Sequence, residues 1–143
     1  MRVAISSTGT ELSAEVSPMF GRCPYFILAD TETLEARAIP NPAISASGGA
    51  GVQSSQMIVR QGVEAVIGVN VGPNALQVFM AAGIPVYQAE EGTVQQAIEA
   101  LQAGQLAALG APTVDKDFGK PGGASARGLG RGMGMGGGRG SGA

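Results

Sequence analysis

The fold is decided by residues 64–87, which read EAVIGVNVGPNALQVFMAAGIPVY. Glu64–Gly68 is a short apolar run, which is typical of a buried strand. Pro73 opens a helix at the position where its missing N–H costs no hydrogen bond, and Gly83 ends it. Ile84–Tyr87 is a second short strand. Strand–helix–strand units with short connections are parallel and right-handed, so this stretch predicts an α/β protein.

Two further helices flank this unit. One is predicted from about Gly51 to Gln61, and it stops at Gly62. The other begins after Thr93, which forms a capping box with Gln96 three residues later. Its apolar positions form one stripe: Val94, Ala97, Ile98 and Leu101. Such a stripe predicts a helix with one buried face.

Three strands are predicted in the first forty residues. Arg2–Ser6 is short and β-branched, Tyr25–Asp30 is strongly apolar, and Leu34–Ile39 alternates apolar and polar residues. The last two are separated by a short polar turn, which predicts a hairpin. The sequence therefore predicts five strands in one mixed sheet flanked by helices.

Composition limits the class of protein. The chain has 143 residues, 44% of them apolar but only 4% aromatic, so the core is built from aliphatic side chains and Met. No apolar run approaches the ~18–20 residues that span a bilayer. The N-terminus has neither the apolar region nor the cleavage site of a secretory signal. We expect a cytoplasmic protein with no membrane partner.

Charge and glycine content divide the chain in two. Residues 1–111 carry four basic and nine acidic residues, whereas residues 112–143 carry five basic and two acidic ones. Half of the 24 glycines lie from Gly119 onward. We expect a compact domain over 1–111 and a disordered Gly-, Arg- and Met-rich tail over 112–143. An alternative function is that this tail binds a protein or RNA.

The chain has one cysteine, Cys23, and no histidine. An internal disulfide and a zinc site of Cys and His ligands are therefore excluded. A conventional iron–sulfur site needs about four Cys thiolates, which this chain lacks. A nuclease or phosphoryl-transfer enzyme needs clustered carboxylates, and the strand Arg2–Ser6 offers none. We therefore expect no enzymatic activity.

Polar loops follow two of the predicted strands. If those strands are neighbours, their loops meet where ligands bind in open α/β sheets. The first loop starts at Ser6 and Ser7, and the second contains Asn70, Gly72 and Asn74. The second loop leads into a helix N-terminus, which favours an anion. The alternative is that its glycines only permit a tight connection.

A second informative stretch, residues 17–26, reads SPMFGRCPYF. The run FGRCPYF after a first strand resembles the signature of the dinitrogenase iron–molybdenum cofactor biosynthesis family. Asn41-Pro42, the glycines of 48–51, Gly72-Pro73 and the GIPV run from Gly83 match the family's pattern in the same order. The resemblance covers roughly residues 1–105.

The resemblance implies a three-layer, ribonuclease H-like fold with strand order 3-2-1-4-5 and strand 2 antiparallel. The family includes carriers of nitrogenase cofactor precursors, the carboxyl-terminal domain of the cofactor-maturing radical enzyme, and a molybdenum–copper sulfide protein of sulfate reducers. The resemblance also implies non-covalent binding, storage or transfer of a preformed anionic metal–sulfur cluster. That cluster is a Mo–Cu sulfide or an iron–molybdenum cofactor precursor, exchanged with donor or acceptor proteins. No nucleotide is expected, nor nucleic acid for the body, and the oligomeric state stays open.

Four residues of the signature are candidate cluster contacts. Arg22 can supply charge and hydrogen bonds to sulfide, and Cys23 and Met19 are soft metal donors. Phe20 completes the run. Some family members carry a histidine where this chain has Met19, so imidazole ligation is not expected. The alternatives are that Arg22 pairs with a carboxylate and that Cys23, Met19 and Phe20 only pack.

Overall fold

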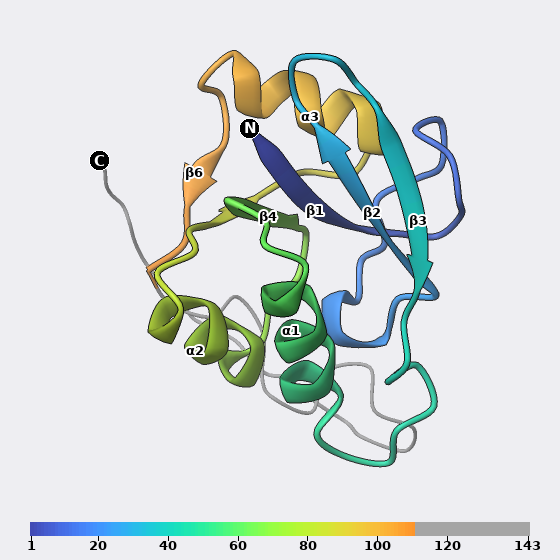
Figure 1. The fold of residues 1–143 in the computed structure, drawn as a ribbon, viewed down its shortest axis with the longest axis vertical. Coiled ribbons are helices and arrows are strands. Elements are labelled where there is room, and N and C mark those ends of the chain that lie inside the picture. The colour runs from blue at the N-terminus through green and yellow to red at the C-terminus, as the bar shows by residue number, and fades with distance from the viewer. Residues whose placement is uncertain (111–143) are drawn as a thin grey trace.

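Six strands form one mixed sheet in the order β3-β2-β1-β4-β5-β6 (Figure 1). The computed structural model describes residues 1–110. The strands are β1 Arg2–Ser7, β2 Tyr25–Asp30, β3 Ala36–Pro40, β4 Ala65–Gly68, β5 Val86–Gln88 and β6 Ala107–Ala108. β1, β4 and β5 run parallel, and β2 is antiparallel to β1. The predicted order 3-2-1-4-5 with an antiparallel second strand is confirmed, and β6 adds one edge strand.

Turn chemistry explains where the predicted strands shift. β3 begins at Ala36 because Leu34 has a φ of 62° and belongs to the turn. Asp30 fixes that turn, since its Oδ1 accepts the N–H groups of Glu32 at 2.8 Å and Thr33 at 3.1 Å. Such an Asx turn supplies the reversal that a hairpin needs.

Three helices cover the two faces of the sheet (Figure 1). α1 (Ala50–Arg60) and α2 (Pro73–Ala81) lie on one face, and α3 (Val94–Gln102) lies on the other. The predicted capping box of α3 is confirmed, because Thr93 Oγ1 accepts from Gln96 N at 3.1 Å and Gln96 Oε1 accepts from Thr93 N at 2.9 Å. A single turn of 3-10 helix, η1 (Phe20–Arg22), lies between β1 and β2.

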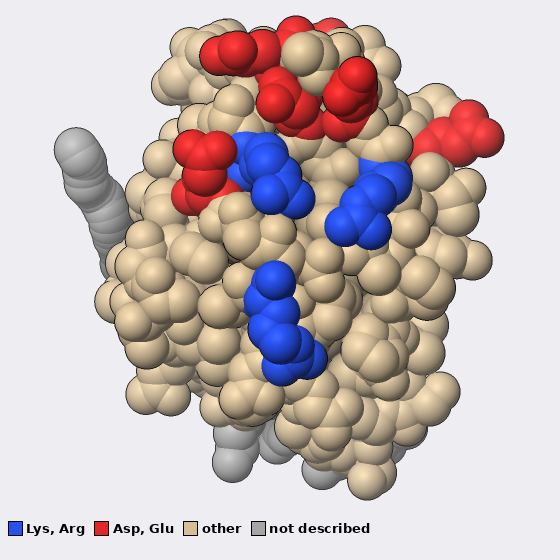
Figure 2. Space-filling view, in the orientation of Figure 1, with Lys and Arg blue, Asp and Glu red and all other residues tan. Residues whose placement is uncertain are grey.

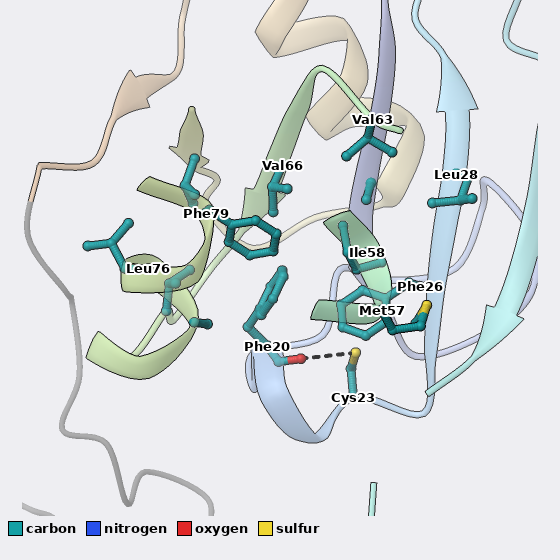
Figure 3. Close-up of a cluster of buried hydrophobic side chains, with 14 residues drawn as sticks. Phe20, Cys23, Phe26, Leu28, Met57, Ile58, Val63, Val66, Leu76 and Phe79 are labelled. Atoms are coloured by element: carbon teal, nitrogen blue, oxygen red, sulfur yellow. Dashed lines mark hydrogen bonds between the residues drawn. The ribbon is translucent and has the colours of Figure 1, made fainter. Parts of the chain in front are cut away.

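Strand alternation divides the core into two layers. Val3 and Ile5 of β1 point toward α3, whereas Ala4 points toward α1 and α2. The ring of Phe20 packs edge-on against Phe26 and Phe79, with ring centroids 5.1 Å and 5.7 Å away. These three rings form the centre of the α1–α2 layer (Figure 3). Three of the six aromatic residues of the chain thus pack together at one place.

The predicted tail, 112–143, lies outside the described residues, and so does the predicted boundary at residue 111. Across residues 1–110, each helix is too short or too polar to pass through a bilayer.

The bare Cα of Gly68 makes room for the ring of Phe20. A Cβ added at Gly68 would lie 2.9 Å from Phe20 Cδ2 and 3.1 Å from Val71 Cγ2. We predict that Gly68→Ala lowers the free energy of unfolding by about 1–3 kcal/mol, because overpacking displaces the ring. Urea unfolding followed by circular dichroism measures it. Gly48→Ala is the control, since no atom lies within 4 Å of its added Cβ. Equal stability of the two variants would contradict this account of Gly68.

Candidate functional site

The loops that follow β1 and β4 meet at the carboxyl end of these neighbouring strands. Phe20 N donates to Asn70 O at 3.4 Å, and Asn70 Nδ2 donates to Pro18 O at 2.8 Å. The side chain of Asn70 therefore holds the loop that precedes η1. This is the arrangement expected from the strand order, and it places η1 beside the entry to α2.

Backbone contacts between small residues bring η1, α1 and α2 together. A Cβ added at Gly21 would lie 3.2 Å from the Cα and N of Gly51. A Cβ added at Gly51 would in turn lie 3.4 Å from Ala75 N and 3.5 Å from Asn74 Cβ. The turn therefore packs on the first turn of α1, which packs on the first turn of α2. Any side chain at Gly21 would push the turn away from α1.

Both helix N-termini at this junction lack a side-chain cap. The N-cap residues are Gly49 for α1 and Gly72 for α2, and neither has a side chain that could accept a hydrogen bond. Within residues 1–110, the N–H groups of Gly51, Asn74 and Ala75 have no hydrogen-bond partner. Unpaired N–H groups and the positive ends of two helix dipoles both favour an anion here.

Arg22, the last residue of η1, adds a full positive charge. Its side chain is half-buried and makes no hydrogen bond or ion pair with any residue from 1 to 110. The alternative that it pairs with a carboxylate of the body is therefore not found in the described part of the chain. The other arginines of that part, Arg2, Arg37 and Arg60, lie in β1, in β3 and at the end of α1.

Acidic side chains are distributed unevenly over the body. On the face shown in Figure 2 they gather at the top, over α3 and the β2–β3 turn. The lower part of the same face, over the N-terminal end of α1, shows none in this view. A body with an excess of acidic residues thus leaves this part of the surface free of repulsion toward an anion.

Cys23 lies inside the core rather than on the surface. Its side chain is fully buried among the aromatic rings, and Sγ donates to Phe20 O at 3.2 Å (Figure 3). Burial raises the pKa of the Cys23 thiol to about 12. Metals bind the thiolate, so a thiol protonated at neutral pH is a poor ligand. Cys23 is therefore a poor candidate for a metal ligand.

The remaining predicted residues fall into two groups. Ser6 and Ser7 are buried, and their hydroxyls donate to Ser17 O at 3.3 Å and to Gly9 O at 2.8 Å. Phe20, like Cys23, is a core residue. Half-exposed positions are held by Met19, Arg22, Asn70, Gly72 and Asn74. The structure thus brings the predicted residues to one junction but leaves only the second group accessible to a ligand.

Two buried polar residues of the junction were not predicted. The side chain of Asn41 reaches Gly21 O and Cys23 O, and Ser54 of α1 reaches Gly21 O. These contacts span 18 to 33 residues of sequence. The Asn41-Pro42 pair belongs to the family pattern, which was the only signal in the sequence that pointed to Asn41.

The buried thiol of Cys23 makes stability depend on pH. The folded state keeps the proton up to a pKa of about 12, whereas the unfolded chain releases it near 9.0. Stability from this group is therefore full below pH 9 and is lost as pH rises toward 12. We predict that wild type loses about 1.4 kcal/mol more than Cys23→Ala between pH 7.5 and pH 10. Denaturant unfolding at both values measures it. Parallel losses would show that the thiol is not buried.

Comparison with known proteins identifies the family. Residues 1–104 match the family described as "Dinitrogenase iron-molybdenum cofactor". The uncharacterized protein MJ0580 of Methanocaldococcus jannaschii is 34% identical over 109 residues, which cover 74% of this chain and 89% of that protein.

Solved structures agree with this match. The apo form of the orange protein from Desulfovibrio gigas is 34% identical, covers 78% of this chain and 94% of its own, and superposes with a TM-score of 0.75. A Thermotoga protein, TM1290, assigned as a NifB protein of the DUF35 family, is 45% identical over 76% of this chain and 92% of its own, with a TM-score of 0.67. The chain belongs to the dinitrogenase iron–molybdenum cofactor family.

Proposed function

We propose that the chain binds a preformed, anionic metal–sulfur cluster at the junction of η1, α1 and α2, and that it stores or transfers this cargo. One observation carries the proposal: two uncapped helix N-termini meet beside η1, and the guanidinium of Arg22, the last residue of η1, has no partner within residues 1–110. The free N–H groups of the helix ends carry partial positive charge and the guanidinium carries a full one. None of them bonds to another group within residues 1–110. Membership of the family supports a role in binding a metal cofactor or cluster in general.

The donor set explains why the cargo must arrive assembled. The one cysteine is buried and protonated, and the chain has no histidine. Residues 1–110 contain no group of three or more His, Cys, Asp or Glu side chains that could hold a metal ion. A finished cluster brings its own sulfide ligands and needs only hydrogen bonds and positive charge from the protein. Of the two soft donors in the signature run, Met19 is the one that remains half-exposed.

The same residues argue against bond chemistry on the cargo. A phosphoryl-transfer or nuclease site needs several carboxylates in one place to hold two metal ions. In the described part of the chain, η1 and the first turns of α1 and α2 contain no Asp or Glu. We therefore assign binding and release to the chain, with a Mo–Cu sulfide or an iron–molybdenum cofactor precursor as cargo and cluster donor or acceptor proteins as partners.

Cargo binding should depend on Arg22. We predict that Arg22→Ala weakens binding about 10- to 100-fold, the value of hydrogen bonds between charged groups. The probe is tetrathiomolybdate with copper(I), added to the full chain without oxygen and followed as a visible chromophore that co-elutes in gel filtration. Arg60→Ala is the matched control, because Arg60 ends the same helix whose first turn packs on η1.

Two results would contradict the proposal. One is that wild type retains neither this chromophore nor an isolated iron–molybdenum cofactor precursor. The other is that Arg22→Ala and Arg60→Ala bind the probe equally well, which would move the site away from η1.

Asn74→Asp should separate stability from binding. A carboxylate in the first turn of α2 interacts favourably with the helix dipole, so we predict an increase of about 0.3–1 kcal/mol in the free energy of unfolding. The same charge repels an anion at the junction, so probe affinity should fall at least about tenfold. Gln77→Glu is the control, since it adds the same charge to an exposed position almost one turn later. If Asn74→Asp binds as wild type does, the N-terminus of α2 is not part of the site.

A further inference from the structure

We infer that Asn41 is a positioning residue for the proposed cargo site, because its buried amide holds the backbone carbonyls of Gly21 and Cys23 inward. The inference rests on the proposed function and extends it to a residue that does not contact the cargo. Asn41 lies in the loop between β3 and α1 and is 4% exposed. Its role follows from where the carbonyl groups of residues 17–24 point.

Almost every carbonyl of this segment is bound by a donor from the protein. Ser17 O accepts from Ser6 Oγ, Pro18 O from Asn70 Nδ2, Met19 O from Arg22 N, and Phe20 O from Cys23 Sγ. Gly21 O, Cys23 O and Pro24 O all accept from Asn41. Arg22 O is the one carbonyl of this segment with no such donor within residues 1–110. The negative ends of these peptide groups are therefore turned away from a ligand.

Because the carbonyls point inward, the N–H ends of the same peptide groups, which carry partial positive charge, point outward. In a trans peptide the C=O and the following N–H point in opposite directions, and the described chain has no cis bond. Because Phe20 O points into the core toward Cys23 Sγ, the N–H of Gly21 points outward. That N–H has no partner among residues 1–110. It therefore joins the donors available to an anion.

Asn41 contributes most to this arrangement. Its Nδ2 donates to Gly21 O at 3.0 Å and to Cys23 O at 2.9 Å, so one amide holds the carbonyls on both sides of Arg22. Its Oδ1 accepts from Ala43 N at 3.0 Å, which fixes the orientation of the amide. With both flanking carbonyls held inward, the Arg22 side chain remains on the outer side of the turn.

Ser54 connects this clamp to α1. Its hydroxyl lies 2.9 Å from Gly21 O and 3.2 Å from Asn41 Oδ1. The network therefore joins η1 to the helix whose first turn carries the other donors. Without it, two buried carbonyls would lose their donors and could turn outward, toward the cargo, where they would repel an anion.

The test compares Asn41→Ala and Ser54→Ala in the full chain with the tetrathiomolybdate and copper(I) probe. Asn41→Ala should weaken binding by the folded protein about tenfold, and Ser54→Ala about threefold. In an Arg22→Ala background the further loss from Asn41→Ala should shrink to less than about threefold, because both changes remove the same feature. Ile98→Ala, in the α3 layer, is the control for lost stability and should leave probe affinity within about twofold.

A second measurement needs no cargo. In native protein, Asn41→Ala should raise the rate at which a thiol reagent modifies Cys23 about tenfold more than Ile98→Ala does, because a loosened η1 exposes the sulfur. Should Asn41→Ala fail to fold, Ser54→Ala decides by the same two readouts.

The outcomes separate this inference from the proposed function. If wild type binds the probe and Arg22→Ala does not, but the Asn41 and Ser54 variants match wild type, the positioning role is wrong and the cargo site stands. Full additivity with Arg22→Ala also overturns the positioning role. If wild type does not bind, the proposed function fails and this inference fails with it.

Discussion

The contact between the ring of Phe20 and the bare Cα of Gly68 is the constraint on which the rest of the site depends. Gly68 is the last residue of β4, and any side chain there would collide with the ring. The ring is thereby held between Phe26 of β2 and Phe79 of α2. Because Phe20 begins η1, this one contact fixes a surface turn to the core. The surface chemistry of the turn thus follows from the packing below it.

The junction presents partial positive charges from main-chain N–H groups, and within residues 1–110 its one full positive charge is that of Arg22. Residues 1–110 contain more acidic than basic residues, so overall charge does not attract an anion. Local polarity favours an anion instead: two helix N-termini lack side-chain caps, buried donors hold carbonyls inward, and the Arg22 guanidinium has no partner among residues 1–110. Such groups are already oriented in the free protein, so the proposed cargo would need little ordering on binding. Uncapped helix ends and a buried polar network both cost stability in the free protein, and cargo binding offers a reason for keeping them.

Much of the fold was predictable from the sequence, because it rests on local patterns. Alternation and apolar runs located β1 to β5, and Pro73, Gly83 and the Thr93 capping box located two helices. β6 was missed because Ala107–Ala108 is two residues long and has no β-branched side chain. The start of β3 was misplaced because the positive φ of Leu34 has no signature in its side chain.

The candidate site was only partly predictable, because its arrangement depends on contacts between residues that are distant in sequence. The signature run pointed to η1 and the helix-start signals to the entry of α2, two segments that the structure joins through Asn70. Composition could not show that Cys23 is buried, because a cysteine can serve either as a soft metal ligand or as a small core residue. Nor could it assign Asn41, whose amide binds carbonyls 18 and 20 residues earlier in the chain.

The central claim is that unpaired amides at the junction bind the cargo, and amide chemical shifts test it most directly. Isotope-labelled full chain is titrated without oxygen with tetrathiomolybdate and copper(I), and the ¹H–¹⁵N spectrum is followed. The account predicts that the largest shifts fall on the N–H groups of Gly21, Gly51, Asn74 and Ala75, and that amides of α3 stay unchanged. Shifts that gather on α3, or saturable binding that leaves those four amides unmoved, would contradict it.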